Sequence, residues 1–182
     1  MLKAKHGLSF IVAAVSVLLL VACGDDNSTK ASDKIVVDSS ETMTDSRDGQ
    51  TYKTVTIGTQ TWMAQNLNYE TANSYCCKDS ASYCTKYGRL YTWAAATTAC
   101  PEGWHLPSQT EWEVLFTAVG GQSTAGKVLK STSGWNNGGN GTDAFAFSAL
   151  PAGGRYNHGG GRRRVLRLRG RRSVLLEFYS VL

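Results

Sequence analysis

The stretch of sequence that decides the fold is HLPSQTEWEVLFTAVGG, residues 105–121. Ser108 followed by Glu111 is a capping-box pattern, in which each side chain satisfies a backbone N–H at the start of a helix. Gly120 supplies a stop signal at the other end. Four apolar residues between these signals recur at helical spacing: Trp112, Leu115, Phe116 and Val119. The stretch therefore predicts an amphipathic helix whose apolar stripe packs on a core and is not a cofactor site.

Strand patterns lie on both sides of this helix. Upstream, Thr51–Ile57 and Gln60–Met63 are rich in β-branched and aromatic residues, and the intervening Gly58 permits a tight turn, so we expect a hairpin. Downstream, Phe145 and Phe147 alternate with alanines and predict another strand. Together with the helix, these elements predict an α+β domain.

Two further segments lie between the hairpin and the helix. Residues 69–86 are polar, rich in Ser, Cys and Tyr, and without apolar period, which predicts a loop. Residues 90–96 contain strong helix formers and predict a short helix. The whole domain spans residues 48–155, which is enough chain for one modest core.

The N-terminus has the composition of an export signal. Lys3 and Lys5 precede an almost continuously apolar run, residues 8–22, which is short for a membrane span. The run ends in Leu-Val-Ala-Cys and resembles the bacterial lipobox. That resemblance implies a signal peptide over residues 1–22 and a Cys23 that becomes the acylated N-terminus, which attaches the protein to a membrane.

Residues 23–47 predict the lipid anchor and a flexible polar tether. They are mostly Ser, Thr, Asp and Lys, so they have little apolar surface to offset the entropy cost of ordering. One small apolar island, residues 35–37, leaves a short edge strand as the alternative. Gly24 replaces the Asp that retains some lipoproteins at the inner membrane, so we expect the outer membrane or the cell surface.

Four cysteines remain in the domain: Cys76, Cys77, Cys84 and Cys100. An even number of cysteines in an exported chain favours disulfides over zinc, because no paired CxxC is present. A bond between the vicinal Cys76 and Cys77 is strained. We therefore predict that one of this pair joins Cys84 and the other joins Cys100, with the choice left open.

No pattern in the domain indicates catalysis or a cofactor. His105, the one histidine of the domain, is more typical of a structural hydrogen bond than of a base. Glu111 and Glu113 are two residues apart and point to different sides of a helix, so they are not a catalytic pair. The loop GWNNGGNGTD, residues 134–143, has oxygens for a cation, but Asn/Gly runs favour backbone turns. We predict no metal ion.

The net charge of +5 comes from the ends of the chain. Residues 162–182 contain seven Arg and one Glu and contribute +6, and the signal segment adds two lysines. The remaining body is weakly acidic. It therefore lacks the clustered cations of a phosphate-binding face, and we expect no nucleic-acid partner.

Several multi-residue motifs occur in an order that resembles the Fibrobacter succinogenes major paralogous domain family, over about residues 48–155. They are DGQTYKTVTIGTQTWMAQNLNY, YGRLYTWAAA, CPEGWHLPSQTEWEVL and GTDAFAFSALPAGGR. The segment around Gly103–Trp112 is also similar to a word of C-type-lectin-like domains, including the formylglycine-generating enzymes. This similarity implies a compact α+β fold with small twisted antiparallel sheets and two helices. The cysteines of those enzymes and the calcium-ligand words of lectins have no match here.

The C-terminus departs from this family pattern after about Gly154. The family closes with a Trp-Ser-Ser-Thr word, whereas residues 156–182 are rich in Arg. Leu176–Ser180 can be encoded so that a shift of one nucleotide reads Trp-Ser-Ser-Thr. We therefore interpret residues 156–182 as a frameshifted tail that leaves the domain incomplete. An intact reading frame on resequencing would contradict this interpretation.

The sequence favours a non-catalytic, lipid-anchored binding module for a polysaccharide or another extracellular polymer. The abundant aromatic residues support this function because exposed rings stack on sugars, although Trp112 is expected in the core. Two alternatives stay open. One is an enzyme of the formylglycine-generating type, and the other is a basic tail that binds membrane or nucleic acid.

Overall fold

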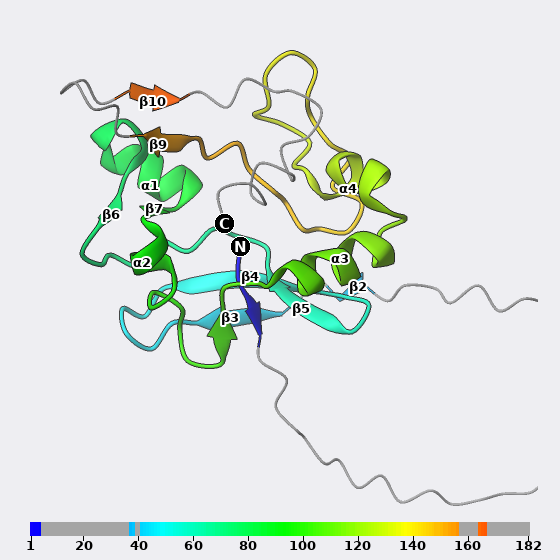
Figure 1. Ribbon diagram of the computed structural model, residues 1–182, viewed down its shortest axis with the longest axis horizontal. Helices are drawn as coiled ribbons and strands as arrows, with labels where there is room; N and C mark the ends of the chain where they lie inside the picture. The colour runs from blue at the N-terminus through cyan, green and yellow to red at the C-terminus, as the bar shows by residue number, and fades with distance from the viewer. Residues whose placement is uncertain (5–36, 39–40, 157–163, 167–182) are drawn as a thin grey trace, which may run out of the picture.

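The computed structural model describes residues 1–4, 37–38, 41–156 and 164–166, and Figure 1 shows their arrangement. A six-stranded sheet has the strand order β2-β4-β5-β1-β8, with β3 also pairing β4. Two-stranded sheets are formed by β6 with β7 and by β9 with β10. All of these strand pairs are antiparallel. The predicted α+β class with small antiparallel sheets is therefore confirmed.

The sheet contains the predicted hairpin. Strands β4 (Thr51–Ile57) and β5 (Gln60–Met63) have the predicted bounds and pair from Thr54↔Met63 to Ile57↔Gln60. Gly58 has φ 61°, the left-handed conformation that the turn requires. Strand β8 is short (Trp104–His105).

Helix α3 (Gln109–Ala118) begins and ends where the sequence predicts. Both halves of the capping box are present: Ser108 Oγ accepts from Glu111 N, and the Glu111 carboxylate accepts from Ser108 N at 2.8 Å. Beyond the helix, Gly121 N donates to Phe116 O at 2.7 Å, and Gly120 and Gly121 both have positive φ. All four residues of the apolar stripe are buried.

The main core lies between this helix, helix α4 (Gln122–Leu129) and the β4–β5 hairpin. Its centre is aromatic. The Trp62 ring centroid lies 4.9 Å from that of Trp112 and 5.9 Å from that of Phe147. A second cluster contains Leu2, Tyr52, Met63, Leu67 and Ala99.

The sequence predicts two helices, whereas the described residues contain four, α1 to α4. Helix α4 was not predicted, and helix α1 (Ala81–Tyr87) lies in the segment predicted as a loop, together with the 3-10 turn η1 (Cys77–Asp79) and strand β6 (Ser74–Tyr75). Helix α1 has no apolar period because Cys84 is its one buried residue. It ends at Gly88, where φ is 73° and a Cβ would lie 2.7 Å from Asn66 Cβ.

Two other predictions need correction. The helix expected over residues 90–96 is a strand β7 (Leu90–Tyr91) followed by a single turn α2 (Trp93–Ala96), because Thr92 caps the turn by accepting from Ala95 N. The strand expected around Phe145 and Phe147 is absent from the described residues. Ala146 and Ser148 have positive φ, and the Asp143 carboxylate accepts from Ser148 N and Oγ at 2.7 and 2.6 Å.

Part of the predicted tether belongs to the fold. Strands β2 (Val37–Asp38) and β3 (Thr42–Thr44) both pair with β4. Of the short edge strand considered for residues 35–37, residue 37 lies in β2. Asp45 is buried, and its carboxylate accepts from Arg47 Nε at 2.8 Å. Residues 41–47, the last part of the predicted tether, therefore contain a strand and a buried side chain.

Both ends of the described chain take part in sheets. Strand β1 (Lys3–Ala4), at the start of the predicted signal peptide, lies between β5 and β8. Strand β9 (Gly154–Tyr156) pairs with β10 (Arg164–Leu166), which lies in the predicted tail. Cys23, the residue predicted to carry the lipid anchor, and most of the Arg-rich tail (157–163 and 167–182) lie outside the described residues.

Candidate functional site

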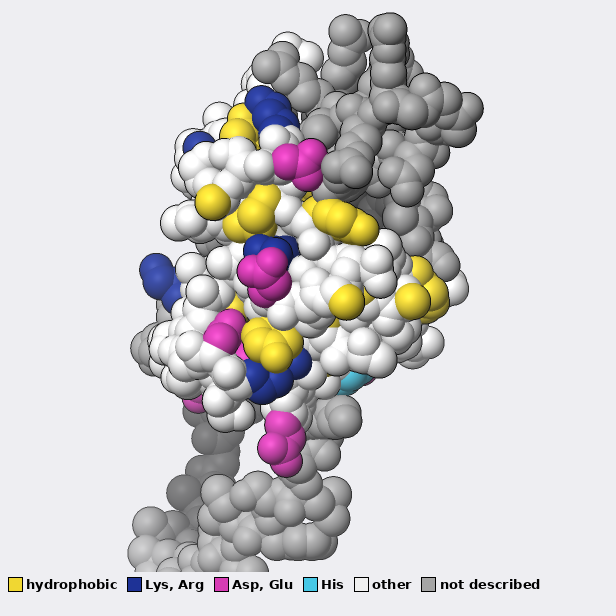
Figure 2. Space-filling view, turned by 90° about the vertical axis from the view of Figure 1, so that its left-hand side faces the viewer, with side chains coloured by type: hydrophobic (Ala, Val, Ile, Leu, Met, Phe, Trp, Pro, Cys, Tyr) yellow, Lys and Arg dark blue, Asp and Glu magenta, His cyan; other side chains and the backbone are white. Residues whose placement is uncertain are grey.

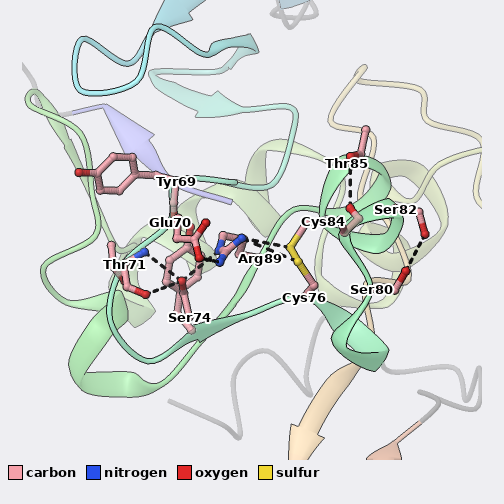
Figure 3. Close-up of a disulfide and its surroundings, with 12 residues drawn as sticks. Tyr69, Glu70, Thr71, Ser74, Cys76, Ser80, Ser82, Cys84, Thr85 and Arg89 are labelled. Atoms are coloured by element: carbon pink, nitrogen blue, oxygen red, sulfur yellow. Dashed lines mark hydrogen bonds and ion pairs between the residues drawn. A yellow bond between two sulfur atoms is a disulfide. The ribbon is translucent and has the colours of Figure 1, made fainter.

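A disulfide joins Cys76, which follows β6, to Cys84 in the middle of α1 (Figure 3). The partner of Cys84 is therefore Cys76, one of the two candidates. The second expected bridge is not formed: Cys77 and Cys100 are both thiols. Burial raises the pKa of the Cys77 thiol, which makes it a poor nucleophile at neutral pH.

Arg89 ties this disulfide to the loop that precedes it. Its NH2 lies 2.6 Å from Glu70 Oε1, its Nε donates to Ser74 Oγ at 3.0 Å, and its NH1 lies 3.6 Å from Cys84 Sγ (Figure 3). The guanidinium of Arg89 thus contacts the loop that contains Glu70, strand β6 and helix α1. Because the guanidinium donors have fixed directions, Arg89 links these three segments at one point.

A second charged cluster lies where β1, β8 and α3 meet. Glu111 Oε1 accepts from Lys3 Nζ at 2.8 Å, and His105 Nε2 lies 2.9 and 3.0 Å from the two carboxylate oxygens. Burial raises the pKa of Glu111, but the hydrogen bonds from Lys3, Ser108 and His105 outweigh this effect and lower it to about 2.

This cluster has a structural role. Glu111 is held as an anion by Lys3, His105 and Ser108, so it is a poor general acid or base at neutral pH. Glu113 points elsewhere on α3 and accepts from Gln109 Nε2 at 2.9 Å. The structural hydrogen bond predicted for His105 is present, and the two glutamates do not form a pair.

The tryptophans divide into core and surface residues. Trp62, Trp112 and Trp135 are buried, as expected for Trp112, and Trp104 is half-buried. Trp93 has a relative exposure of 56%. Among the described residues, the other exposed large hydrophobic residue is Val114, at 43%. Figure 2 shows the side of the molecule at the left of Figure 1, where hydrophobic side chains form separate groups among polar ones.

The Asn/Gly loop forms turns, as predicted. Asn137, Gly138 and Asp143 have positive φ. Lys130 Nζ donates to Gly139 O and lies 4.9 Å from the Trp135 ring centroid, so a cation of the protein itself already occupies the inside of this loop. Among the described residues, no group of His, Cys, Asp and Glu is arranged to hold a metal ion.

One charged pair that the sequence pattern did not predict joins the buried Asp45 to Arg47, whose side chain is 28% exposed. The Asp45 carboxylate binds Arg47, whose NH2 also donates to Ala99 O at 2.9 Å and whose Cζ lies 3.8 Å from the Tyr69 ring centroid. The turn signal Asp48-Gly49 directly after these residues was the available clue, because Gly49 N donates back to Asp45 O.

None of the helices in the described part of the chain has the length and hydropathy needed to cross a membrane.

Comparison with known proteins identifies the family. No curated protein and no solved structure matches the chain. A family model described as Fibrobacter succinogenes major domain matches residues 55–167, which is more than half of the chain. This match extends beyond residue 155, the boundary predicted from sequence, and includes the β9–β10 pair. The chain therefore belongs to the Fibrobacter succinogenes major domain family.

Proposed function

We propose that this protein is an exported, lipid-anchored and non-catalytic module that binds a polysaccharide or a similar extracellular polymer through Trp93. The exposure of this indole carries the proposal. An exposed tryptophan offers a large flat apolar face with a polar N–H, and that combination suits stacking on a sugar ring.

The backbone that carries Trp93 is held at several points. Thr92 N donates to Asn73 O at 3.2 Å, and the preceding Tyr91 pairs with Ser74 in the β6–β7 ribbon. The Tyr91 hydroxyl donates to Tyr69 O at 2.6 Å. The Arg89 contacts and the disulfide brace the same ribbon. A binding residue on a rigid frame loses little conformational entropy when its ligand binds, which supports affinity.

Export and lipid attachment are part of this proposal. The Cys76–Cys84 disulfide supports an oxidising compartment outside the cytoplasm. The lipobox-like sequence before Cys23 supplies the anchor, and the weakly acidic body suits a protein exposed at the cell surface. We further propose that the α+β arrangement is a C-type-lectin-like fold.

Retention by insoluble polysaccharides tests the binding function. The full chain is incubated with a panel of these polymers, and the bound fraction is compared with that of Trp93→Ala. Val114→Ala is the matched control, because it removes another exposed large hydrophobic side chain of the part that the structure describes. We expect Trp93→Ala to lose retention and Val114→Ala to keep it. Equal retention of both variants, or no retention of the parent chain, would contradict the proposal.

Incorporation of labelled palmitate tests the anchor separately. We expect the parent chain to take up the label and Cys23→Ser to take up none, because serine has no thiol to carry the lipid. Equal labelling of the two chains would exclude Cys23 as the anchor.

A further inference from the structure

Strand β1 occupies the interior of the sheet. Lys3 pairs with Trp62 of β5 on one side and with His105 of β8 on the other, and Ala4 pairs with Trp104. Met63 N also donates to Leu2 O at 2.8 Å. In the described sheet, β8 joins β5 through β1. The first four residues therefore fill a strand-shaped slot between β5 and β8.

The two sides of this slot select different side chains. Leu2 is buried in the cluster that contains Met63, Leu67 and Ala99. The next residue, Lys3, points to the opposite face, as expected for successive residues of a strand, and binds Glu111. Its relative exposure is 3%, so the slot encloses the cation completely. An apolar residue followed by a cation is the pattern that fits.

Met1, which precedes β1, is half-buried against the main core, and desolvation of its amine lowers the pKa of that amine to about 6.

Processing at Cys23 would empty the slot, because residues 1–4 belong to the proposed signal peptide. The backbone groups of β5 and β8 that β1 pairs with would lose their partners, and Glu111 would lose Lys3. Unpaired strand edges are templates for another strand. A carboxylate left without its cation strengthens that tendency.

We propose that the slot between β5 and β8 is a strand-acceptor site for an extended segment of another polypeptide that carries an apolar residue followed by Lys or Arg. The inference rests on the proposed export and processing, which remove the chain's own occupant. Backbone pairing with both neighbouring strands supplies affinity, as in other strand-addition complexes. The apolar cluster that contains Leu2 and Leu67, together with the anionic Glu111, supplies the sequence preference.

Peptide exchange on the full chain tests this site. Residues 8–22 are replaced by a protease site, so that the chain folds with its first residues attached and is then cut. Size-exclusion chromatography shows whether the N-terminal fragment stays bound. A fluorescent peptide of residues 1–7, MLKAKHG, is then used to displace it, and its affinity is measured by anisotropy.

Variants of the peptide leave the domain unchanged, so misfolding cannot explain their behaviour. We expect Lys3→Arg to bind like the parent peptide and Lys3→Glu to bind at least about tenfold more weakly, because it places two carboxylates together. Lys5→Glu has the same net charge as Lys3→Glu and is the matched control, with affinity close to that of the parent peptide.

Three results would overturn the proposal. The first is that the fragment is lost on cutting and the peptide does not bind. The second is that the Lys3→Glu and Lys5→Glu peptides bind equally. The third is that the peptide binds only to a variant that lacks residues 167–182, which would identify the chain's own tail as the occupant. The readout uses no polysaccharide and no membrane, so its outcome is independent of the tests of Trp93 and Cys23.

Discussion

Lys3 Nζ lies 2.8 Å from Glu111 Oε1, although 108 positions separate the two residues in the sequence. The same carboxylate accepts from Ser108 N in the capping box of α3. One ion pair thus connects the first strand of the sheet to the start of the helix that forms the core. In the full chain, this arrangement makes the first four residues part of the folded domain.

The ion pair predicts a large loss of stability for Lys3→Met in the full chain. We expect about 2–4 kcal/mol, because the change leaves a partly buried carboxylate without its cation. Urea unfolding followed by circular dichroism measures the difference. Lys53→Met, which removes an exposed lysine of β4, is the matched control. Equal unfolding midpoints for the two variants would contradict the structural role of Lys3.

The buried Met1 amine predicts that stability rises between pH 6 and pH 8. Its pKa is about 6 in the folded chain and 8.0 in the reference state, so the unfolded chain binds more protons in this window. Protonation of the unfolded chain therefore costs stability as the pH falls, by about 2–3 kcal/mol in all. Urea midpoints measured across this range, on chain that retains Met1, check the prediction. Acetylation of the amine should flatten the profile, and an unchanged slope after acetylation would assign it to other groups.

The cysteines predict a specific alkylation pattern. In denaturant without reductant, iodoacetamide should modify Cys77 and Cys100 and leave Cys76 and Cys84 unmodified until a reductant is added. In the native protein Cys77 should react more slowly than it does in denaturant, because burial raises the pKa of its thiol. Peptide mass spectrometry locates each modification. Protection of Cys77 and Cys100 in denaturant would indicate a second disulfide.

The Asp45–Arg47 pair predicts that the domain begins before residue 48. Asp45→Asn should destabilise the protein by about 2–3 kcal/mol, because it removes a buried charge and turns an amide donor toward the Arg47 guanidinium. Asp48→Asn, at an exposed position that keeps its acceptor oxygen, is the control and should have little effect. Equal thermal midpoints for the two variants would place Asp45 outside the cooperative unit.

Local signals in the sequence predicted the β4–β5 hairpin and the α3 capping box because both depend on residues close in sequence. The segment at Phe145 and Phe147 has the alternation of a strand, yet the Asp143 side chain holds the backbone in turns that composition does not reveal. Helix α1 escaped prediction because its stability comes from Cys84 and the contacts of Arg89, which lie outside the helical pattern. Lys3 and Asp45 lie in segments whose composition is typical of a signal peptide and of a flexible tether, respectively. Their places in the fold depend on partners distant in sequence.

Trp93 fluorescence tests the binding function most directly. A soluble oligosaccharide of the retained polymer is titrated into the full chain and into Trp93→Phe, which removes the exposed indole but keeps an aromatic ring. We expect the emission of the parent chain to shift to shorter wavelength as the ligand covers Trp93, which is 56% exposed, and the variant to show no shift. The same shift in Trp93→Phe, or none in the parent chain, would contradict binding through Trp93.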